Sequence, residues 1–108
     1  MKFIFVTLAL ALSGCGVIAG SAHCTFEKSS GNRCQERLDS LNAAAFKATG
    51  STAGGVCGDG ACPTADRVGG CLLGKQGDGS PINDWYYAPK TKADAMAECD
   101  TGETFLEP

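Results

Sequence analysis

Apolar residues crowd the beginning of this chain and become sparse and periodic in the rest of it. Residues 3–12 form a ten-residue hydrophobic run, and no charged side chain occurs in the whole segment 3–22. The run is too short for a helix that crosses a bilayer, which needs about 20 apolar residues, whereas the uncharged segment just reaches that length. This pattern predicts either a cleaved export signal or an uncleaved membrane anchor.

The first periodic element after this segment is a helix expected over residues 35–49. Its apolar positions recur at intervals of three and four residues and are Leu38, Leu41, Ala45 and Ala48. Such spacing places side chains on one face of a helix, with Asn32 as the expected N-cap and Gly50 as the expected C-terminal stop. Residues 24–31 and 50–60 are rich in turn-forming residues and glycine and are expected to be loops.

A β-hairpin is expected next, with strands over 67–73 and 82–87 joined by a glycine-rich turn over 74–81. The second strand ends in three residues of high β-propensity, Trp85, Tyr86 and Tyr87. Gly69 and Gly70 weaken the first strand, unless bulky aromatic rings of the partner strand cover them. Because side chains alternate along a strand, at least one of the three rings must face away from the others. We expect Trp85 to pack in the core and retain all three rings as candidate contacts for a partner.

A second helix and a third short strand complete the expected fold. Thr91 and Asp94 have the spacing of a capping box, and Gly102 is the expected end of the helical region. The apolar stripe of this helix is formed by Ala93, Met96 and Ala97. Thr104–Leu106 is the expected third strand. The sequence therefore predicts an α+β domain in which two short helices pack on a β-hairpin or three-stranded antiparallel sheet.

Cysteine is abundant, with seven residues in a chain of 108. Six of them follow residue 22 and are Cys24, Cys34, Cys57, Cys62, Cys71 and Cys99. In an exported chain of this size an even set predicts three disulfides, whose connectivity the sequence alone does not fix. Cys71 with Cys99 is the first pair that we expect, because it would join the hairpin to the second helix.

Zinc binding is the alternative to disulfides for these cysteines. Only Cys57 and Cys62 are closely spaced, and the sole histidine, His23, lies beside Cys24. Structural zinc sites usually have two close pairs of ligands. We therefore expect no metal and no other cofactor.

The remaining cysteine, Cys15, is the first in the chain. It ends the sequence Leu12-Ser13-Gly14-Cys15, which resembles a bacterial lipobox. The resemblance implies cleavage before Cys15, a diacylglycerol on its sulfur and, usually, an acyl chain on its amine. The chain would then consist of a signal peptide over 1–14, an acylated cysteine with a flexible tether over 15–23, and a cysteine-rich domain over 24–108. Two alternatives remain, namely an uncleaved anchor and cleavage after Ala22, which would release a soluble domain that starts at His23.

The lipobox also implies a location in the bacterial envelope, where Cys15 would insert its acyl chains among membrane lipids. In Gram-negative lipoproteins an Asp directly after the acylated cysteine resembles a signal for retention in the inner membrane. Gly16 occupies that position here. The resemblance therefore implies the outer membrane, with secretion as the alternative.

The net charge argues against nucleic acid as a partner. The chain contains nine Lys and Arg and twelve Asp and Glu. Removal of Lys2 with the signal peptide would leave eight basic and twelve acidic residues, a net charge of −4. No basic stripe is visible in the sequence, whereas nucleic-acid-binding domains rely on one. An acidic surface is also repelled by anionic lipids, so attachment to a membrane would depend on the acyl chains.

The second half of the chain resembles a group of short bacterial lipoproteins of unknown function. The likeness is carried by the block 62–71 (CPTADRVGGC), by Tyr86-Tyr87 with Pro89, and by a closing motif of Cys99, Gly102, Thr104 and Phe105. Cys24 and Cys57 depart from that pattern. The resemblance implies a membrane location and a regular fold, and it brings no activity with it.

Three classes of function are compatible with these features. The favoured one is a non-enzymatic module that contacts another envelope protein or a wall component. The second is a secreted, disulfide-rich inhibitor or toxin-like peptide, which requires cleavage after Ala22. The third is a minor hydrolase that would depend on carboxylates alone, namely Asp78, Asp84, Asp94 and Glu98. We do not expect an enzyme, because His23 is the sole histidine and no Gly-x-Ser-x-Gly motif occurs.

Overall fold

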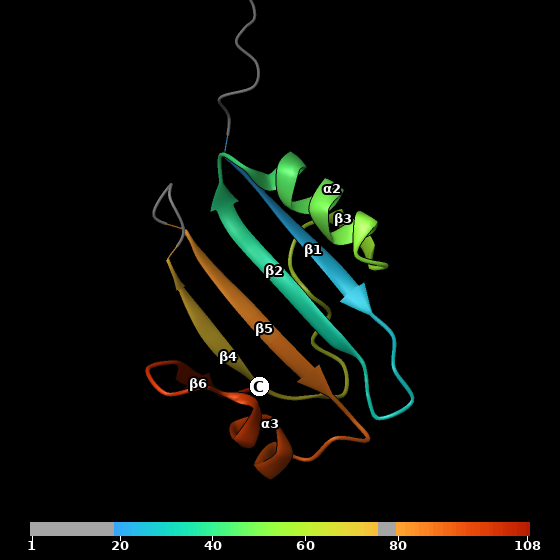
Figure 1. Cartoon of the computed structure of the whole chain (residues 1–108), viewed down its shortest axis with the longest axis vertical. Coiled ribbons are helices and arrows are strands. Elements are labelled where there is room, and N and C mark those ends of the chain that lie inside the picture. The colour runs from blue at the N-terminus through green and yellow to red at the C-terminus, as the bar shows by residue number, and fades with distance from the viewer. Residues whose placement is uncertain (1–18, 76–79) are drawn as a thin grey trace, which may run out of the picture.

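The computed structural model describes residues 19–75 and 80–108, which form one antiparallel sheet and two short helices (Figure 1). The strands are β1 (Gly20–Phe26), β2 (Arg33–Ser40), β3 (Val56–Asp59), β4 (Arg67–Lys75), β5 (Pro81–Tyr87) and β6 (Thr104–Leu106). The helices are α2 (Ala43–Thr52) and α3 (Lys92–Glu98). The strand order is β3-β1-β2-β5-β4-β6, and all neighbours are antiparallel. The expected hairpin or three-stranded sheet with two helices is therefore wrong, because the sheet has six strands.

β1 occupies a stretch that we expected to be the tether and a loop. Its residues alternate between buried and partly exposed, with Ala22 and Cys24 completely or almost completely buried. These inward positions hold a small residue and a cysteine, so the sequence shows no alternation of large apolar residues there. β1 pairs with β2 on one side and with β3 on the other. Residues 20–23, which we assigned to the tether over 15–23, therefore belong to the folded sheet.

β2 replaces the first part of the helix that we expected over 35–49. The buried residues of β2 are Cys34, Glu36 and Ser40, which are separated by even numbers of residues, as alternation along a strand requires. Leu41, which the helical pattern placed on a buried face, is 55% exposed. The helix prediction failed because the alternating buried positions are occupied by a cysteine and polar residues.

The helix begins only at Ala43 and continues through Gly50 to Thr52, into the region expected to be a loop. α2 buries none of its residues. A Cβ at Gly50 would lie 2.3 Å from Cys24 Sγ, so the missing side chain allows the helix to lie directly on β1. β3 follows α2, and it too replaces part of the expected loop.

The C-terminal half of the sheet was predicted correctly. β4 and β5 form the expected hairpin, and β6 pairs with β4. Gly70 lies opposite Trp85, and a Cβ at Gly70 would lie 2.6 Å from the indole ring. α3 begins at the expected capping box, in which Thr91 Oγ1 accepts a hydrogen bond from the Asp94 N–H and the Asp94 carboxylate accepts one from the Thr91 N–H. These elements could be predicted because the aromatic residues and the helix cap that specify them lie close together in the sequence.

Three disulfides cross-link the fold, and they are Cys24–Cys57, Cys34–Cys62 and Cys71–Cys99. The set confirms the number of bonds and the expected Cys71–Cys99 pair. Cys57 and Cys62, the closest cysteines in the sequence, belong to different disulfides. These two therefore serve as cross-links rather than as a pair of zinc ligands.

Both helices lie on the same face of the sheet, here called the helix face (Figure 1). Cys24 lies opposite Gln35 in the neighbouring strand, and Asp84 lies opposite both Gln35 and Cys71. Residues that lie opposite each other in an antiparallel pair point to the same face. Cys24 beneath α2 and Cys71 beside α3 therefore share the helix face.

The other face, here called the loop face, is covered by the segment between β3 and β4. Cys34 points to this face because it is the neighbour of Gln35 in β2, and it is bonded to Cys62 in that segment. Cys34 and Cys62 pack with Trp85 and Tyr87 in a buried cluster. A second cluster, around Cys71 and Ala95, lies under α3 on the helix face. The sheet thus has a core on each side.

Candidate functional site

A buried polar network lies on the helix face, where Arg33, Asp84 and Tyr86 meet. Arg33 Nε and Nη2 donate hydrogen bonds to the two Asp84 carboxylate oxygens, each over 2.7 Å. Tyr86 Oη donates to Asp84 Oδ2 over 2.9 Å. Asp84 is buried, whereas the Arg33 side chain is partly exposed. Burial raises the pKa of Tyr86 far above its ordinary value, and the Asp84 charge raises it further.

A pocket of about 220 Å³ opens above this network, between the β1–β2 loop and α3. Its charged lining residues are Lys28, Arg33, Lys90 and Glu98. Lys90 Nζ forms an ion pair with Glu98 Oε2 over 3.2 Å, and the same ammonium group lies 5.8 Å from the centre of the Tyr86 ring. Both carboxylates at this site, those of Asp84 and Glu98, are thus paired with cations. The pocket therefore presents charged groups that are already paired within the fold.

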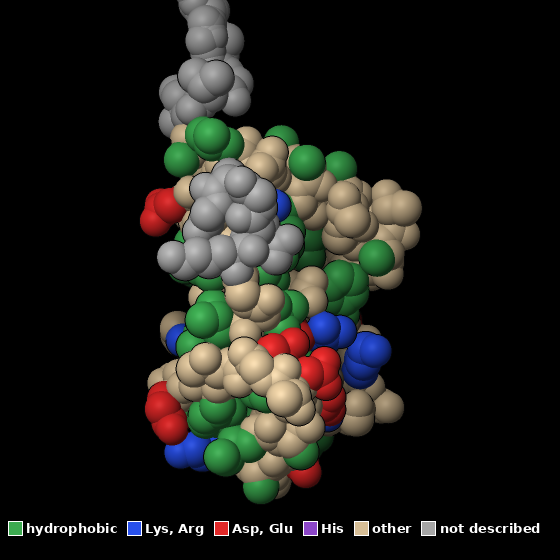
Figure 2. Space-filling model, turned by 60° about the vertical axis from the view of Figure 1, so that its left-hand side comes forward, with side chains coloured by type: hydrophobic (Ala, Val, Ile, Leu, Met, Phe, Trp, Pro, Cys, Tyr) green, Lys and Arg blue, Asp and Glu red, His purple; other side chains and the backbone are tan. Residues whose placement is uncertain are grey.

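Acidic and basic side chains lie close together on the surface of the chain, and Figure 2 shows them intermixed on one side of the molecule. The ion pairs outside the buried network join Lys47 to Asp59, Lys90 to Glu98 and Lys92 to Glu107. Such exposed pairs contribute little to stability. They also leave this view without an extended region of one sign that would attract a highly charged polymer.

The three aromatic rings that we singled out are all buried. Trp85, Tyr86 and Tyr87 are only 6–7% exposed. Trp85 and Tyr87 belong to the loop-face cluster and Tyr86 to the helix-face cluster, so the predicted alternation is confirmed. Tyr87 Oη donates a hydrogen bond to the Pro63 carbonyl over 2.7 Å. The rings therefore support both cores, and little of their surface is open to a partner.

Arg67 covers the outer side of the indole of Trp85, with its guanidinium carbon 3.7 Å from the ring centre. This distance is typical of a cation–π contact. Among the described residues, the indole N–H of Trp85 and the Nε–H of Arg67 are buried without a hydrogen-bond partner. The contact therefore depends on stacking rather than on hydrogen bonds from these two donors.

A buried carboxylate on the loop face also escaped the sequence analysis. Glu36 Oε1 accepts a hydrogen bond from the Cys62 N–H over 2.8 Å, and Oε2 accepts one from Asn83 Nδ2 over 2.9 Å. Glu36 thus fixes the covering segment beside the Cys34–Cys62 disulfide. The spacing of Cys34 and Glu36 at alternate positions was the only local signal for this role.

The three candidate carboxylates that the structure describes are each engaged by another group of the fold. Asp94 completes the capping box of α3, and the hydrogen bond from the Thr91 backbone lowers its pKa. Glu98 is paired with Lys90, and Asp84 with Arg33. Asp78 lies outside the described residues. No two of the three described carboxylates face a common free space in the pockets found on this part of the chain.

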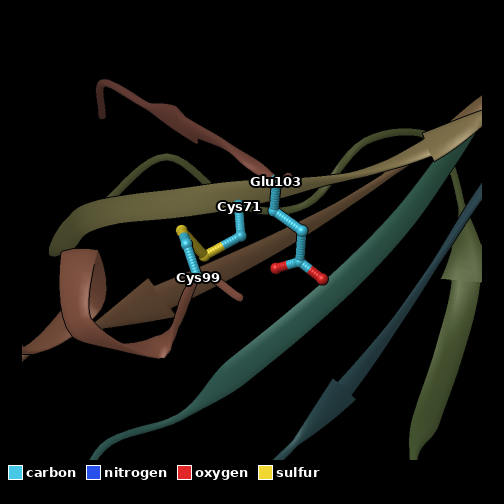
Figure 3. Close-up of side chains that lie close together, drawn as sticks. All are labelled: Cys71, Cys99 and Glu103. Atoms are coloured by element: carbon cyan, nitrogen blue, oxygen red, sulfur yellow. A yellow bond between two sulfur atoms is a disulfide. The ribbon is translucent and has the colours of Figure 1, made fainter. Parts of the chain in front are cut away.

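Cys71, Cys99 and Glu103 form a group of potential metal ligands, with their sulfur and oxygen atoms all within 4.8 Å of one another. Figure 3 shows that the two sulfur atoms are bonded to each other. Metals bind cysteine as a thiolate, and a disulfide offers none. In this oxidised form the group is a cross-link with a nearby carboxylate.

The expected lipidation site, Cys15, and the signal peptide lie outside the described residues. Within 19–75 and 80–108, no helix is long and apolar enough to span a membrane. The chain matches no protein-family model, no curated protein and no solved structure.

Proposed function

We propose that this chain is a lipoprotein, anchored to a bacterial membrane through Cys15, whose folded domain is a non-enzymatic interaction module. The observation that carries the proposal is the pairing of the cysteines. All six cysteines after residue 22 form disulfides with one another. Cys15 is left as the one cysteine outside this set, and it stands at the position where the lipobox motif predicts acylation.

The disulfides also support export. Stable disulfides form in oxidising compartments and are rare in the bacterial cytosol. Two or three acyl chains on Cys15 would hold the protein stably at a membrane, whereas one chain gives only reversible binding. Since the chain is acidic, the acyl chains rather than surface charge would supply the attachment.

The position of β1 disfavours release by cleavage after Ala22. Ala22 is fully buried and pairs with Arg37 of β2 and with Asp59 of β3. A cut after Ala22 would remove the first three residues of a strand that lies between two others. A cut before Cys15 leaves the whole strand in place. We therefore favour the lipoprotein over the secreted inhibitor or toxin-like peptide.

Binding is favoured over catalysis because the buried polar groups are engaged within the fold. Asp84 is held by Arg33 and Tyr86, and Glu36 by Cys62 and Asn83. The pocket above Arg33 offers charged groups at its rim. An envelope protein or a wall component that carries an acidic or polar group would fit this chemistry.

The intact mass of protein taken from the membrane fraction tests the proposal. We expect a chain that starts at Cys15 and carries acyl groups, and we expect Cys15→Ser to remain at the mass of the unprocessed precursor. A chain that starts at His23 would support secretion instead, and an unmodified full-length chain would support an uncleaved anchor. Either result would overturn the proposal.

Localisation to the outer membrane is tested by a second substitution. Gly16→Asp should shift the protein toward the inner membrane of a Gram-negative host, whereas Gly16→Asn, which adds no charge, is the matched control. The unaltered protein should sediment with the outer membrane. Its recovery solely in the inner membrane would contradict this assignment.

A further inference from the structure

The beginning of β1 limits how far the folded domain can lie from its anchor. β1 starts at Gly20, so only residues 16–19 separate it from Cys15. An extended chain spans at most about 3.6 Å per residue, which places Gly20 within about 18 Å of Cys15. If Cys15 is acylated, as the proposed function states, the end of the sheet that contains Gly20 must lie at the lipid surface.

The residues at this end of the sheet follow from the strand pairing. Gly20 lies opposite Ser40, the last residue of β2, and Leu41 comes directly afterwards. Asp59, the last residue of β3, lies opposite Ala22. The start of β1, the end of β2 and the beginning of α2 are together at one end of the molecule, whereas the β1–β2 loop and α3 are at the other (Figure 1). β1 itself spans about 20 Å between these ends, at about 3.3 Å per residue.

This end has small polar and apolar residues, an exposed carboxylate at Asp39 and one ion pair, and it lacks a cluster of basic side chains among the described residues. A shallow depression there is lined by Gly20, Leu41, Ala43, Ala44, Lys47 and Asp59, among others. Leu41 is 55% exposed, and Lys47 and Asp59 form an ion pair with each other. The connecting residues 16–19 are Gly, Val, Ile and Ala and carry no charge. Contact with lipid would therefore be hydrophobic, since a lipid-binding surface of the electrostatic kind needs several unpaired cations.

We infer that the sheet stands on the lipid surface with the end formed by Gly20, Ser40 and Leu41 toward the bilayer, and that the Leu41 side chain contacts the lipid. The opposite end then points away from the membrane. It carries the pocket lined by Lys28, Arg33 and Lys90, which becomes the part of the domain that is presented to other molecules.

The chain contains internal controls for this orientation. Among the residues that the structure describes, the exposed large hydrophobic ones are Leu41, Val56 and Met96, at 55%, 69% and 52%. Of these three, Leu41 alone lies at the end that contains Gly20, since Val56 lies opposite Thr25 near the end of β1. Met96 belongs to α3 at the other end. A surface that is buried by lipid should therefore protect Leu41 and leave Met96 accessible.

Hydroxyl-radical footprinting of the acylated protein on phosphatidylethanolamine–phosphatidylglycerol vesicles tests this inference. The reference is a variant with about 12 Gly and Ser residues inserted between Ile18 and Ala19, which adds roughly 20 Å of reach. We expect oxidation of Leu41 to be at least about three-fold lower in the unaltered protein than in the variant, because an apolar group at the bilayer boundary is shielded from water. Oxidation of Met96 should be the same in both.

Equal oxidation of Leu41 in the two proteins would overturn the inference, and so would protection of Met96 to the same extent as Leu41. The intact mass of the footprinted sample separates this failure from failure of the proposed function. Acylated protein with an accessible Leu41 rejects the orientation alone. Protein without acyl chains rejects the lipoprotein itself and the orientation with it.

Discussion

The two helices lie on the same face of the sheet, but they are held there in different ways. α3 has seven residues, a complete capping box and the fully buried Ala95, which packs in the cluster of Tyr86 and Cys71. α2 is longer, with ten residues, but it has no side-chain cap and no buried residue. It lies directly on the Cys24–Cys57 disulfide at Gly50. Length therefore does not decide how firmly a helix is held. α3 is held by the buried Ala95 and by the Cys71–Cys99 bond at its C-cap, whereas α2 contains no cysteine and rests on a disulfide that joins β1 to β3.

The largest expected effect comes from removing the largest side chain of the loop-face core. Trp85→Ala should destabilise the fold by about 3–5 kcal/mol, as truncations of large buried aromatic residues do. Trp85 lies in β5 at the centre of the loop-face cluster, so both helices should be lost in one thermal transition. Calorimetric or circular-dichroism melts measure the change.

Trp85→Phe is the matched control for this substitution. It retains an aromatic ring and removes an indole N–H that has no hydrogen-bond partner among the described residues. Its effect should therefore be clearly smaller than that of Trp85→Ala. An unchanged melting temperature for Trp85→Ala would mean that the ring does not support the core.

Removal of the Cys24–Cys57 disulfide is the next largest change and separates the two helices. Replacing both cysteines by Ala should destabilise the protein by about 3–4 kcal/mol on a chain-entropy estimate. Hydrogen exchange should accelerate more in α2 than in α3, because α2 has no buried residue to hold it.

Removal of Cys71–Cys99 is the control, since the sequence separations of the two disulfides are similar, at 33 and 28 residues. The global loss of stability should be comparable. Even so, α3 in the variant without Cys71–Cys99 should stay better protected from hydrogen exchange than α2 in the variant without Cys24–Cys57, because Ala95 and the capping box remain. If α3 without Cys71–Cys99 exchanged its amide hydrogens as fast as α2 without Cys24–Cys57, the proposed difference between the two helices would be wrong.

A smaller effect is expected from Asp84→Asn, which acts beside α3. The change removes the charge that accepts hydrogen bonds from Arg33 and Tyr86, and hydrogen bonds to charged groups contribute about 1.5–3 kcal/mol. Urea denaturation should show a loss of about 2 kcal/mol. Glu98→Gln breaks an exposed ion pair and should change stability by less than about 1 kcal/mol. If the two variants lost equal amounts of stability, Asp84 would not be a buried group and Glu98 an exposed one, as assigned here.

Ionisation of the two tyrosines has the smallest effect on stability at neutral pH. Tyr86 and Tyr87 are the only tyrosines in the chain. Burial raises the pKa of both Tyr86 and Tyr87 above the ordinary value of 10.0. The native state therefore holds these protons more tightly than the unfolded state. Their contribution to stability is complete below pH 10 and declines as the pH rises toward their native pKa values.

Absorbance of tyrosinate during an alkaline titration measures this effect. The native protein should show little tyrosinate at pH 10, where unfolded protein in urea would be about half ionised. In Asp84→Asn the pKa of Tyr86 should fall, because both the charge and the hydrogen bond of Asp84 raise it. Ionisation of either native tyrosine at its ordinary pKa would place that ring outside the core.

The C-terminal part of the fold could be predicted because its signals are local. Each signal lies within a few residues of the element that it specifies. These signals are the run of three aromatic residues, the capping pair Thr91 and Asp94, and a glycine that accommodates a ring. The Cys71–Cys99 bond followed from the placement of the hairpin and α3. For the same reason the alternation of Trp85, Tyr86 and Tyr87 between the two faces was predictable from the spacing of side chains in a strand.

The N-terminal part could not be predicted because its strands are defined by distant partners. In β2 the buried residues Cys34 and Glu36 include no large apolar side chain. Both are fixed by residues far away in the sequence. Cys34 is bonded to Cys62, and Glu36 accepts hydrogen bonds from Cys62 and Asn83, which are 26 and 47 residues away. The spacing of Leu38, Leu41, Ala45 and Ala48 instead suggested a helix that begins at residue 35. Tertiary contacts thus outweighed local propensity.

The candidate site was only partly visible for the same reason. Arg33 and Asp84 are 51 residues apart in sequence, and nothing around either residue indicates a bidentate pair. Asp84 was noted as a carboxylate, and the structure shows it joined to Arg33 of the neighbouring strand β2. The lipid anchor at Cys15 stays a prediction from its motif.

The order in which the disulfides close has a consequence for export. The bonds Cys24–Cys57 and Cys34–Cys62 overlap in sequence, whereas Cys71–Cys99 stands apart. A chain that is translocated from its N-terminus exposes Cys24 and then Cys34 to oxidation before either native partner has emerged. A rapid oxidant would join these first two thiols to each other, and that bond must then be broken by thiol–disulfide exchange. If the chain is exported as proposed, we therefore expect its maturation to require a disulfide isomerase as well as an oxidase.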